Sequence, residues 1–154
     1  MLINSLYLLS LVIWVGGIIF FSFITAPSIF KILPPEYASK TISALFNKYY
    51  PLGIVSGLVA FVSLIFSAIK TGHWPVLKII LVLIMLGLTL YSSINIHPKA
   101  RALKEEIQSA TGKTEVGFLQ EEFDRVHHIS VINNAVVLLL GLILIVITAR
   151  SFIL

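Results

Sequence analysis

Residues 11–30 read LVIWVGGIIFFSFITAPSIF, an apolar run with the sequence Trp-Val-Gly-Gly near its middle. No charged residue occurs between Leu2 and Ile29. An α-helix rises about 1.5 Å per residue, so roughly 20 such residues cross the ~30 Å hydrocarbon layer of a bilayer. The run therefore predicts a membrane-spanning helix, which makes lipid the solvent for this part of the chain.

The composition of the whole chain supports a membrane protein. Of the 154 residues, 58% are hydrophobic and 12% are charged, and the mean hydropathy is +1.01. Soluble domains carry about 25% charged residues. The absence of cysteine excludes disulfides and thiolate metal sites. In so apolar a chain, the net charge of +4 indicates loops beside an anionic membrane surface rather than nucleic-acid binding.

The N-terminal run differs from a cleaved signal peptide in three respects. It lacks a basic n-region, it exceeds the usual apolar length of about 7 to 15 residues, and Ile24 occupies a position that should be small. We expect this segment to stay attached as the first span.

Further apolar runs predict an all-α fold, an integral membrane four-helix bundle forming a single domain over residues 1–154. The predicted spans cover about residues 2–29, 52–69, 76–96 and 127–149.

Two polar connections complete the predicted bundle. The pattern over about residues 36–49 predicts a short amphipathic helix on the membrane surface, ending just before Pro51. Residues 98–126 are rich in charge, break near Gly112 and keep apolar residues at helical spacing. They predict a cytoplasmic helical hairpin that extends the third and fourth spans.

The distribution of basic residues predicts the orientation. The side with the two longer connections carries Lys31, Lys40, Lys48, Lys99, Arg101, Lys104, Lys113 and Arg125. The other side carries Lys70, Lys78 and Arg150. Because basic residues concentrate in cytoplasmic loops, both termini are predicted to lie outside the cytoplasm.

Small residues predict where the helices pack. Trp14 lies near the middle of its span beside Gly16 and Gly17, where a neighbouring helix or a flat ligand could approach the backbone. Gly53 and Gly57 form a Gly-x-x-x-Gly pattern in the second span, typical of close helix packing.

Polar residues at one end of the third and fourth spans form the candidate cofactor-binding site. They are Asn95, His97, His127, His128, Ser130 and Asn134. The spacing of His127, Ser130 and Asn134 places them on one helical face, whereas His128 points elsewhere. The histidines could be hydrogen-bonded interfacial side chains or axial ligands of a b-type haem. We predict no catalytic residue and no protein-built metal site.

The chain resembles the bacterial transmembrane protein 205-like family. The resemblance rests on motifs spread over nearly the whole chain, which are Trp14-Val15-Gly16-Gly17, Ala26-Pro27, Leu45-Phe46, Tyr49-Tyr50, Pro98, Arg101 and Phe123-x-x-Val126-His127 with Ser130 and Asn134. It implies a four-span domain without a settled role, in a bacterial cytoplasmic membrane. Trp14-Val15-Gly16 and Trp74 with Lys78 give a layout that is more distantly similar to copper resistance protein D and to membrane-bound protoporphyrinogen oxidase. The resemblance to the oxidase implies a haem-carrying helix bundle.

Three functional hypotheses follow. The first is a non-catalytic accessory subunit or binding bundle, with the lipid bilayer and a larger membrane complex or a second copy as partners. The second is a b-type haem-binding oxidoreductase. The third is a transporter of small molecules or metal, which the lack of acidic residues in the predicted spans and of cysteine disfavours.

Overall fold

The computed structural model describes the backbone of residues 2–153 and the side chains of residues 2–151, and every regular element in it is helical. In chain order the elements are α1 (Leu2–Ile19), η1 (Phe20–Thr25), α2 (Ala26–Ile32), α3 (Pro35–Thr71), α4 (Val76–Tyr91), η2 (Ser92–Ile96), α5 (His97–Ser109) and α6 (Lys113–Ile153). Consecutive elements join into four long rods, each long and apolar enough to cross a membrane, over Leu2–Ile32, Pro35–Thr71, Val76–Ser109 and Lys113–Ser151. The predicted all-α fold with four apolar helices is confirmed.

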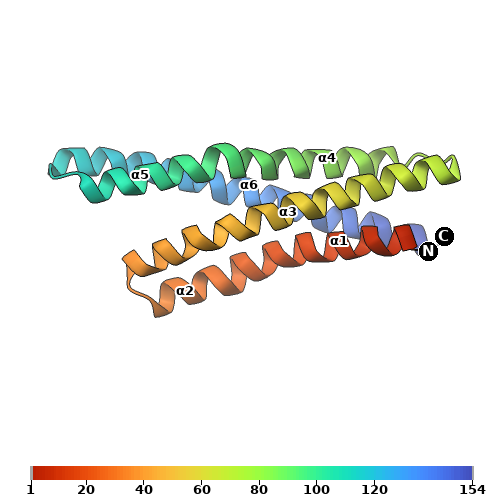
Figure 1. Ribbon diagram of the computed structural model, residues 1–154, viewed down its shortest axis with the longest axis horizontal. Helices are drawn as coiled ribbons and strands as arrows, with labels where there is room; N and C mark the ends of the chain where they lie inside the picture. The colour runs from red at the N-terminus through yellow and green to blue at the C-terminus, as the bar shows by residue number, and fades with distance from the viewer. Residues whose placement is uncertain (1, 154) are drawn as a thin grey trace.

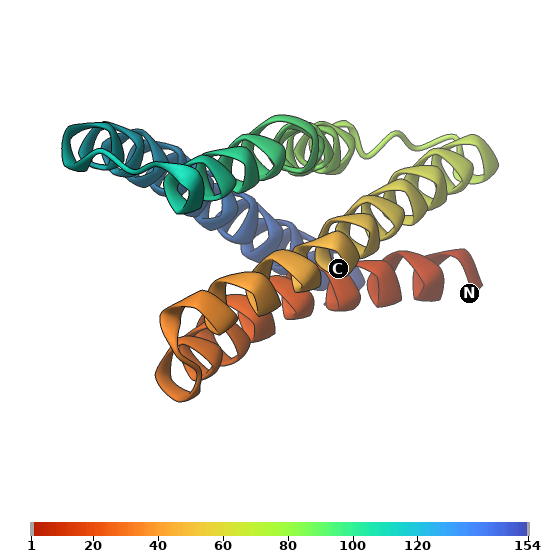
Figure 2. The same cartoon turned by 60° about the vertical axis from the view of Figure 1, so that its left-hand side comes forward.

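The rods run alternately up and down along one long axis (Figure 1). Both termini lie at the same end as the link of residues 72–75, where Gly72 ends α3 in the left-handed conformation with a φ of 71°. The links of residues 33–34 and 110–112 lie toward the other end. There the α2/α3 hairpin and the α5/α6 hairpin diverge (Figure 2).

The long rods exceed the thickness of a bilayer. α3 has 37 residues and α6 has 41, so they extend about 55 and 60 Å, roughly twice the hydrocarbon thickness. The charged residues of the α5/α6 hairpin therefore lie beyond the apolar parts of the rods, and the helical hairpin expected over residues 98–126 is present.

The predicted interfacial helix at about residues 36–49 differs from the structure. These residues form the first part of α3, which continues through Pro51 without interruption. Ala38 and Ile42 are buried, and this part of α3 packs against α2. Part of the apolar face therefore packs on a neighbouring helix, and the position of this segment on a membrane surface stays a prediction.

The core lies where all four rods approach one another. Its buried members are Tyr7, Leu11, Trp14, Ile18, Ala60, Leu64, Val82, Met85, Leu86, Val137 and Leu144. A smaller cluster of Ile96, Leu103 and Val126 joins the α5/α6 hairpin. Large apolar side chains such as Phe20, Val62 and Ile143 are exposed around the outside, which suits contact with lipid.

Two π-helical turns occur just before prolines. In η1 and η2 the final backbone N–H reaches five residues back, from Ala26 to the Phe21 carbonyl and from His97 to the Ser92 carbonyl. Pro27 and Pro98 follow directly. Because proline has no N–H and its ring clashes with the preceding turn, a widened turn accommodates it within a continuous rod.

Candidate ligand-binding cavity

A cavity of about 400 Å³ lies between the two diverging hairpins. We call it the hairpin cavity. It is lined by Phe21, Ser22, Phe23, Ala26, Ser43, Phe46, Tyr50, Ile96, His97, Ala100, Arg101, Lys104, Phe123, His127, Ser130, Val131, Asn134, Ala135 and Leu138. Its volume falls in the range of about 300 to 1,000 Å³ that is usual for small-molecule sites.

Two polar stripes line this cavity from neighbouring helices. On α5, His97, Arg101 and Lys104 are spaced i, i+4, i+7, which places them on one face. On α6, the predicted stripe of His127, Ser130 and Asn134 also lines the cavity.

The cavity changes from charged to apolar along its length. Lys104 and Arg101 lie at the hairpin end, while Ala135 and Leu138 lie farther along α6. From His127 to Leu138 the helix rises about 16 Å, close to half the hydrocarbon thickness. One end of the cavity therefore reaches the charged region and the other reaches the apolar interior.

Hydrogen bonds hold a polar band at the inner part of the cavity. The Tyr49 hydroxyl donates to Oδ1 of Asn134 at 2.7 Å, and Nδ2 of Asn134 donates to Oγ of Ser22 at 2.9 Å. Asn133 beside it donates to the Leu88 carbonyl at 2.9 Å and to Oγ of Ser92 at 2.5 Å. These bonds connect α6 to η1, α3, α4 and η2.

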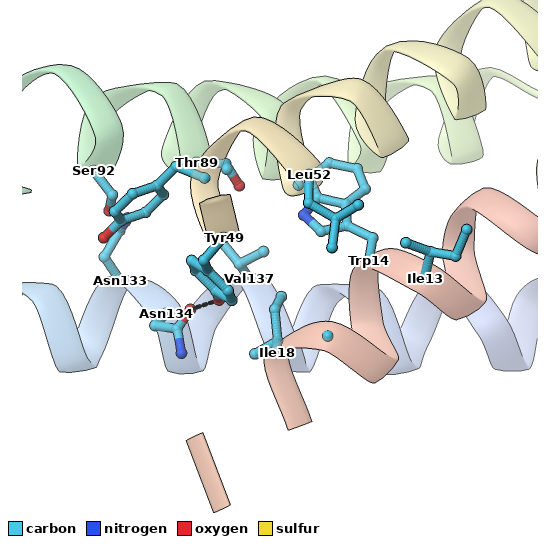
Figure 3. A pocket seen from close by; sticks show the side chains of 13 residues that line it. Ile13, Trp14, Ile18, Tyr49, Leu52, Thr89, Ser92, Asn133, Asn134 and Val137 are labelled. Carbon is cyan, nitrogen blue, oxygen red and sulfur yellow. Dashed lines mark hydrogen bonds between the residues drawn. The ribbon is translucent and has the colours of Figure 1, made fainter. Parts of the chain in front are cut away.

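A second, smaller space adjoins this band, and Figure 3 shows the side chains that line it. This central chamber measures about 20 Å³, enough for one water molecule. Trp14 from α1, Tyr49 from α3, Thr89 from α4 and Asn133 from α6 meet there (Figure 3). Tyr50 and Asn134 line both spaces, so the central chamber continues the polar band of the hairpin cavity.

The charges around the hairpin cavity are unbalanced. Arg101 and Lys104 line it, and its lining in the described structure includes no carboxylate. Nε of Arg101 contacts Oε1 of Glu105 at 3.0 Å. Lys104 forms no ion pair with any described residue, and its Nζ lies 5.1 Å from the centroid of the Phe123 ring. Burial lowers the pKa of the Lys104 ammonium.

His97 and His127 approach the cavity from different helices. The His97 ring packs against the rings of Phe46 and Tyr50, with centroid distances of 5.2 and 5.7 Å. The His127 ring stacks on Phe123 at 6.0 Å. Burial, followed by the positive charges of Arg101 and Lys104, lowers the pKa of His97.

The structure separates the predicted polar residues into two groups. His97, His127, Ser130 and Asn134 line the hairpin cavity. Asn95 and His128 are exposed and line neither space. His128 follows His127 by one residue, about 100° around the helix, so the two cannot share a face.

The predicted packing residues also fall into two groups, those in close contact with a neighbouring helix and those that are not. Trp14 is 3% exposed and lies over the glycines of α3. A Cβ at Gly57 would lie 2.7 Å from Cη2 of Trp14, and one at Gly53 would lie 3.2 Å from its Nε1. In the described structure no helix closely approaches Gly16 or Gly17, because a Cβ at either would meet nothing within 4 Å, but Gly17 lines the central chamber together with Trp14. Gly16 is two residues from Trp14 and so faces away from α3.

Several cavity residues were absent from the predicted site. They include Phe46, Tyr50, Arg101, Lys104 and Asn133. The i, i+4, i+7 spacing of His97, Arg101 and Lys104 is visible in the sequence and indicates a polar face that continues the third span beyond Pro98. Asn133 is a second signal, because an amide within an apolar span needs a partner.

Comparison with known families gives one match. Residues 9–109 match a domain of unknown function, DUF4149. The chain belongs to this family. No match was found among curated proteins or among solved structures. The matched range of the DUF4149 chain ends within α5, so His127, Ser130 and Asn134 lie on a helix outside it. These findings support a domain of unknown function, and none supports the finer resemblance to the transmembrane protein 205-like family or to copper resistance protein D.

Proposed function

We propose that this protein is a non-catalytic membrane binding bundle that holds an amphipathic molecule in the hairpin cavity. The observation that carries the proposal is the graded lining, with Lys104 and Arg101 at one end and Ala135 and Leu138 at the other. A molecule with a polar head and an apolar tail complements such a gradient. The hydrogen-bonded band of Asn134 and Ser22 lies between these ends and would meet the polar atoms that join head to tail.

A bacterial cytoplasmic membrane with both termini outside the cytoplasm is the setting we propose. In this orientation the cationic end of the cavity lies at the cytoplasmic surface.

The test is a cavity-filling substitution in the full-length protein. Ala135 lines the cavity, so Ala135→Phe should reduce the number of phospholipids that stay bound to the detergent-purified protein in native mass spectrometry. Ala149→Phe is the matched control on the same helix, since Ala149 is exposed and outside the cavity. Equal phospholipid retention by the two variants would contradict the proposal.

A b-type haem is the second candidate, favoured by His97 and His127 lining one cavity from two helices. Imidazole is a common axial ligand of haem iron, and haem would supply one-electron chemistry when bound. An absorption spectrum of protein from haem-replete cells tests it. A Soret band that is lost in both His97→Ala and His127→Ala would support haem, and a colourless protein would contradict it.

A further inference from the structure

The charge around the hairpin cavity restricts the kind of headgroup it can hold. Its lining provides two basic side chains, Arg101 and Lys104, and no carboxylate within the described residues. An outer groove of about 360 Å³ continues from the same two residues toward Lys40 and Glu105. Basic pockets between membrane helices are suited to anionic lipid headgroups.

Among the basic residues at this end of the described chain, Lys104 alone is partly buried, since Lys31, Lys40, Lys48, Lys99, Arg101, Lys113 and Arg125 are all exposed. Lys40, Lys99 and Arg101 each contact a carboxylate, from Glu36, Glu122 and Glu105 at 2.7, 2.8 and 3.0 Å respectively. Lys104 has no carboxylate contact within the described chain, and it is partly buried beside Phe123. A half-buried ammonium without a counter-ion is an unfavourable arrangement that an incoming anion would relieve.

The depth of the cavity restricts the rest of the ligand. The cavity continues along α6 to Leu138 and is flanked there by Phe21 and Phe23 of η1. The rise of about 16 Å from His127 to Leu138 matches the hydrocarbon depth of one leaflet. A free anion would leave this apolar length unfilled, whereas a lipid tail would occupy it.

We infer that the hairpin cavity holds a phospholipid with a net negative headgroup, its phosphate beside Lys104 and an acyl chain between η1 and α6. This inference rests on the proposed binding function and specifies its ligand. Arg101 stays paired with Glu105 and adds positive potential at the mouth. The hydroxyls of Ser22 and Ser130 lie beside the linkage between head and chain.

The experiment compares phosphatidylglycerol, which is anionic, with phosphatidylcholine, which has the same phosphate and no net charge. Each lipid is titrated into delipidated full-length protein and its binding is followed by native mass spectrometry. The wild type should bind phosphatidylglycerol about tenfold more tightly, the effect expected of one charge-assisted contact. Lys104→Gln should abolish this preference, because it weakens the binding of phosphatidylglycerol more than that of phosphatidylcholine, whose phosphate is the same but whose headgroup has no net charge.

Two further variants serve as controls. Lys104→Arg keeps the charge and should keep the preference. Lys99→Gln removes a positive charge from the same helix, but Lys99 is exposed, pairs with Glu122 and lies outside the cavity, so it should also keep the preference. A melting curve for each variant separates lost binding from lost folding. If folded Lys104→Gln retained the preference, the inference would be wrong.

The remaining outcomes distinguish the two proposals. Equal binding of the two lipids, with both reduced by Ala135→Phe, would overturn the anionic headgroup and leave the binding bundle intact. Binding that Ala135→Phe does not reduce would overturn the binding bundle itself. Excess inorganic phosphate should leave phosphatidylglycerol bound. Displacement of phosphatidylglycerol by inorganic phosphate would show that the site takes a free anion instead of a lipid.

Discussion

Trp14 shows how a single side chain sets the distance between two helices. Its indole ring lies over Gly53 and Gly57 of α3, and the absence of side chains at these positions lets α1 and α3 approach. Gly141 of α6 has a similar role against Val15, since a Cβ there would lie 2.6 Å from Cγ2 of Val15. Packing of this kind stabilises helix pairs in lipid, where the hydrophobic effect gives them no preference for each other.

The glycines provide a matched pair of substitutions. Gly57→Ala should reduce the free energy of unfolding by about 1 to 3 kcal/mol, because the added methyl overlaps Trp14 and Leu86. Gly16→Ala adds the same methyl where nothing lies within 4 Å, and it should be neutral or stabilising by about 0.5 to 1 kcal/mol. Denaturation of the detergent-solubilised protein measures both. Equal effects of the two substitutions would show that the Trp14 contact is unimportant.

Asn134 makes two cross-helix hydrogen bonds in the polar band, with Tyr49 and Ser22. Asn134→Leu removes its bonds with Tyr49 and Ser22, and we expect a loss of about 1 to 2 kcal/mol in the same denaturation experiment. Asn95→Leu is the control, because Asn95 is exposed and its side chain makes no hydrogen bond with the described residues. A loss at Asn95 as large as that at Asn134 would contradict this interpretation.

At the scale of elements, the π-helical turns lie at the places where the two hairpins begin to diverge. η1 and η2 both border the hairpin cavity, and each marks the point where a rod continues into one of the two hairpins. α5 packs mainly on α6 and η2. Between α3 and α5 the rings of Phe46 and Tyr50 meet His97, with spaces of about 400 and 300 Å³ on either side.

This arrangement predicts that the two hairpins move relative to each other. Spin labels at Lys48→Cys on α3 and Glu106→Cys on α5 should give a broad distance distribution in lipid-free detergent, which narrows when phosphatidylglycerol is added. The natural chain has no cysteine, so no background substitution is needed. Double electron–electron resonance measures the distribution.

The control for this motion is a pair of labels within one hairpin. Glu106→Cys and Glu121→Cys lie on α5 and α6, which share the buried cluster of Ile96, Leu103 and Val126. Their distance distribution should be narrow with or without lipid. Narrow and unchanged distributions for both pairs would mean that the hairpin cavity is rigid.

At the scale of the whole molecule, the alternating rods place the links of residues 33–34 and 110–112 at one end and residues 72–75 with both termini at the other (Figure 1). Eight basic residues, Lys31, Lys40, Lys48, Lys99, Arg101, Lys104, Lys113 and Arg125, belong to the first end, against Lys70, Lys78 and Arg150 at the second. This asymmetry predicts that the cationic mouth of the hairpin cavity faces the cytoplasm.

Cysteine labelling tests that orientation. In intact bacterial cells, a membrane-impermeant maleimide should label His73→Cys in the α3–α4 link and leave Thr111→Cys in the α5–α6 link unlabelled. Both positions are exposed, so access to solvent is matched. Labelling of Thr111→Cys in intact cells, with His73→Cys reacting after lysis alone, would reverse the orientation.

The local properties of the chain could be predicted from the sequence. Hydropathy and charge identified the four apolar helices and the charged hairpin, because each depends on a short run of residues. The Gly53 and Gly57 pair was also predictable, since its spacing alone indicates close packing. The stripe of His127, Ser130 and Asn134 was identified in the same way from helical periodicity.

The tertiary structure decided which helix faces pack against one another. In a membrane chain, the residues that contact lipid and those that contact other helices are both apolar, so periodicity does not distinguish them. This is why Gly16 was assigned to a close helix contact that it does not make, and why residues 36–49 were expected to form a separate helix instead of the first part of α3. The hairpin cavity joins residues from η1, α3, α5 and α6 that are far apart in the chain, and only the crossing of the rods brings them together.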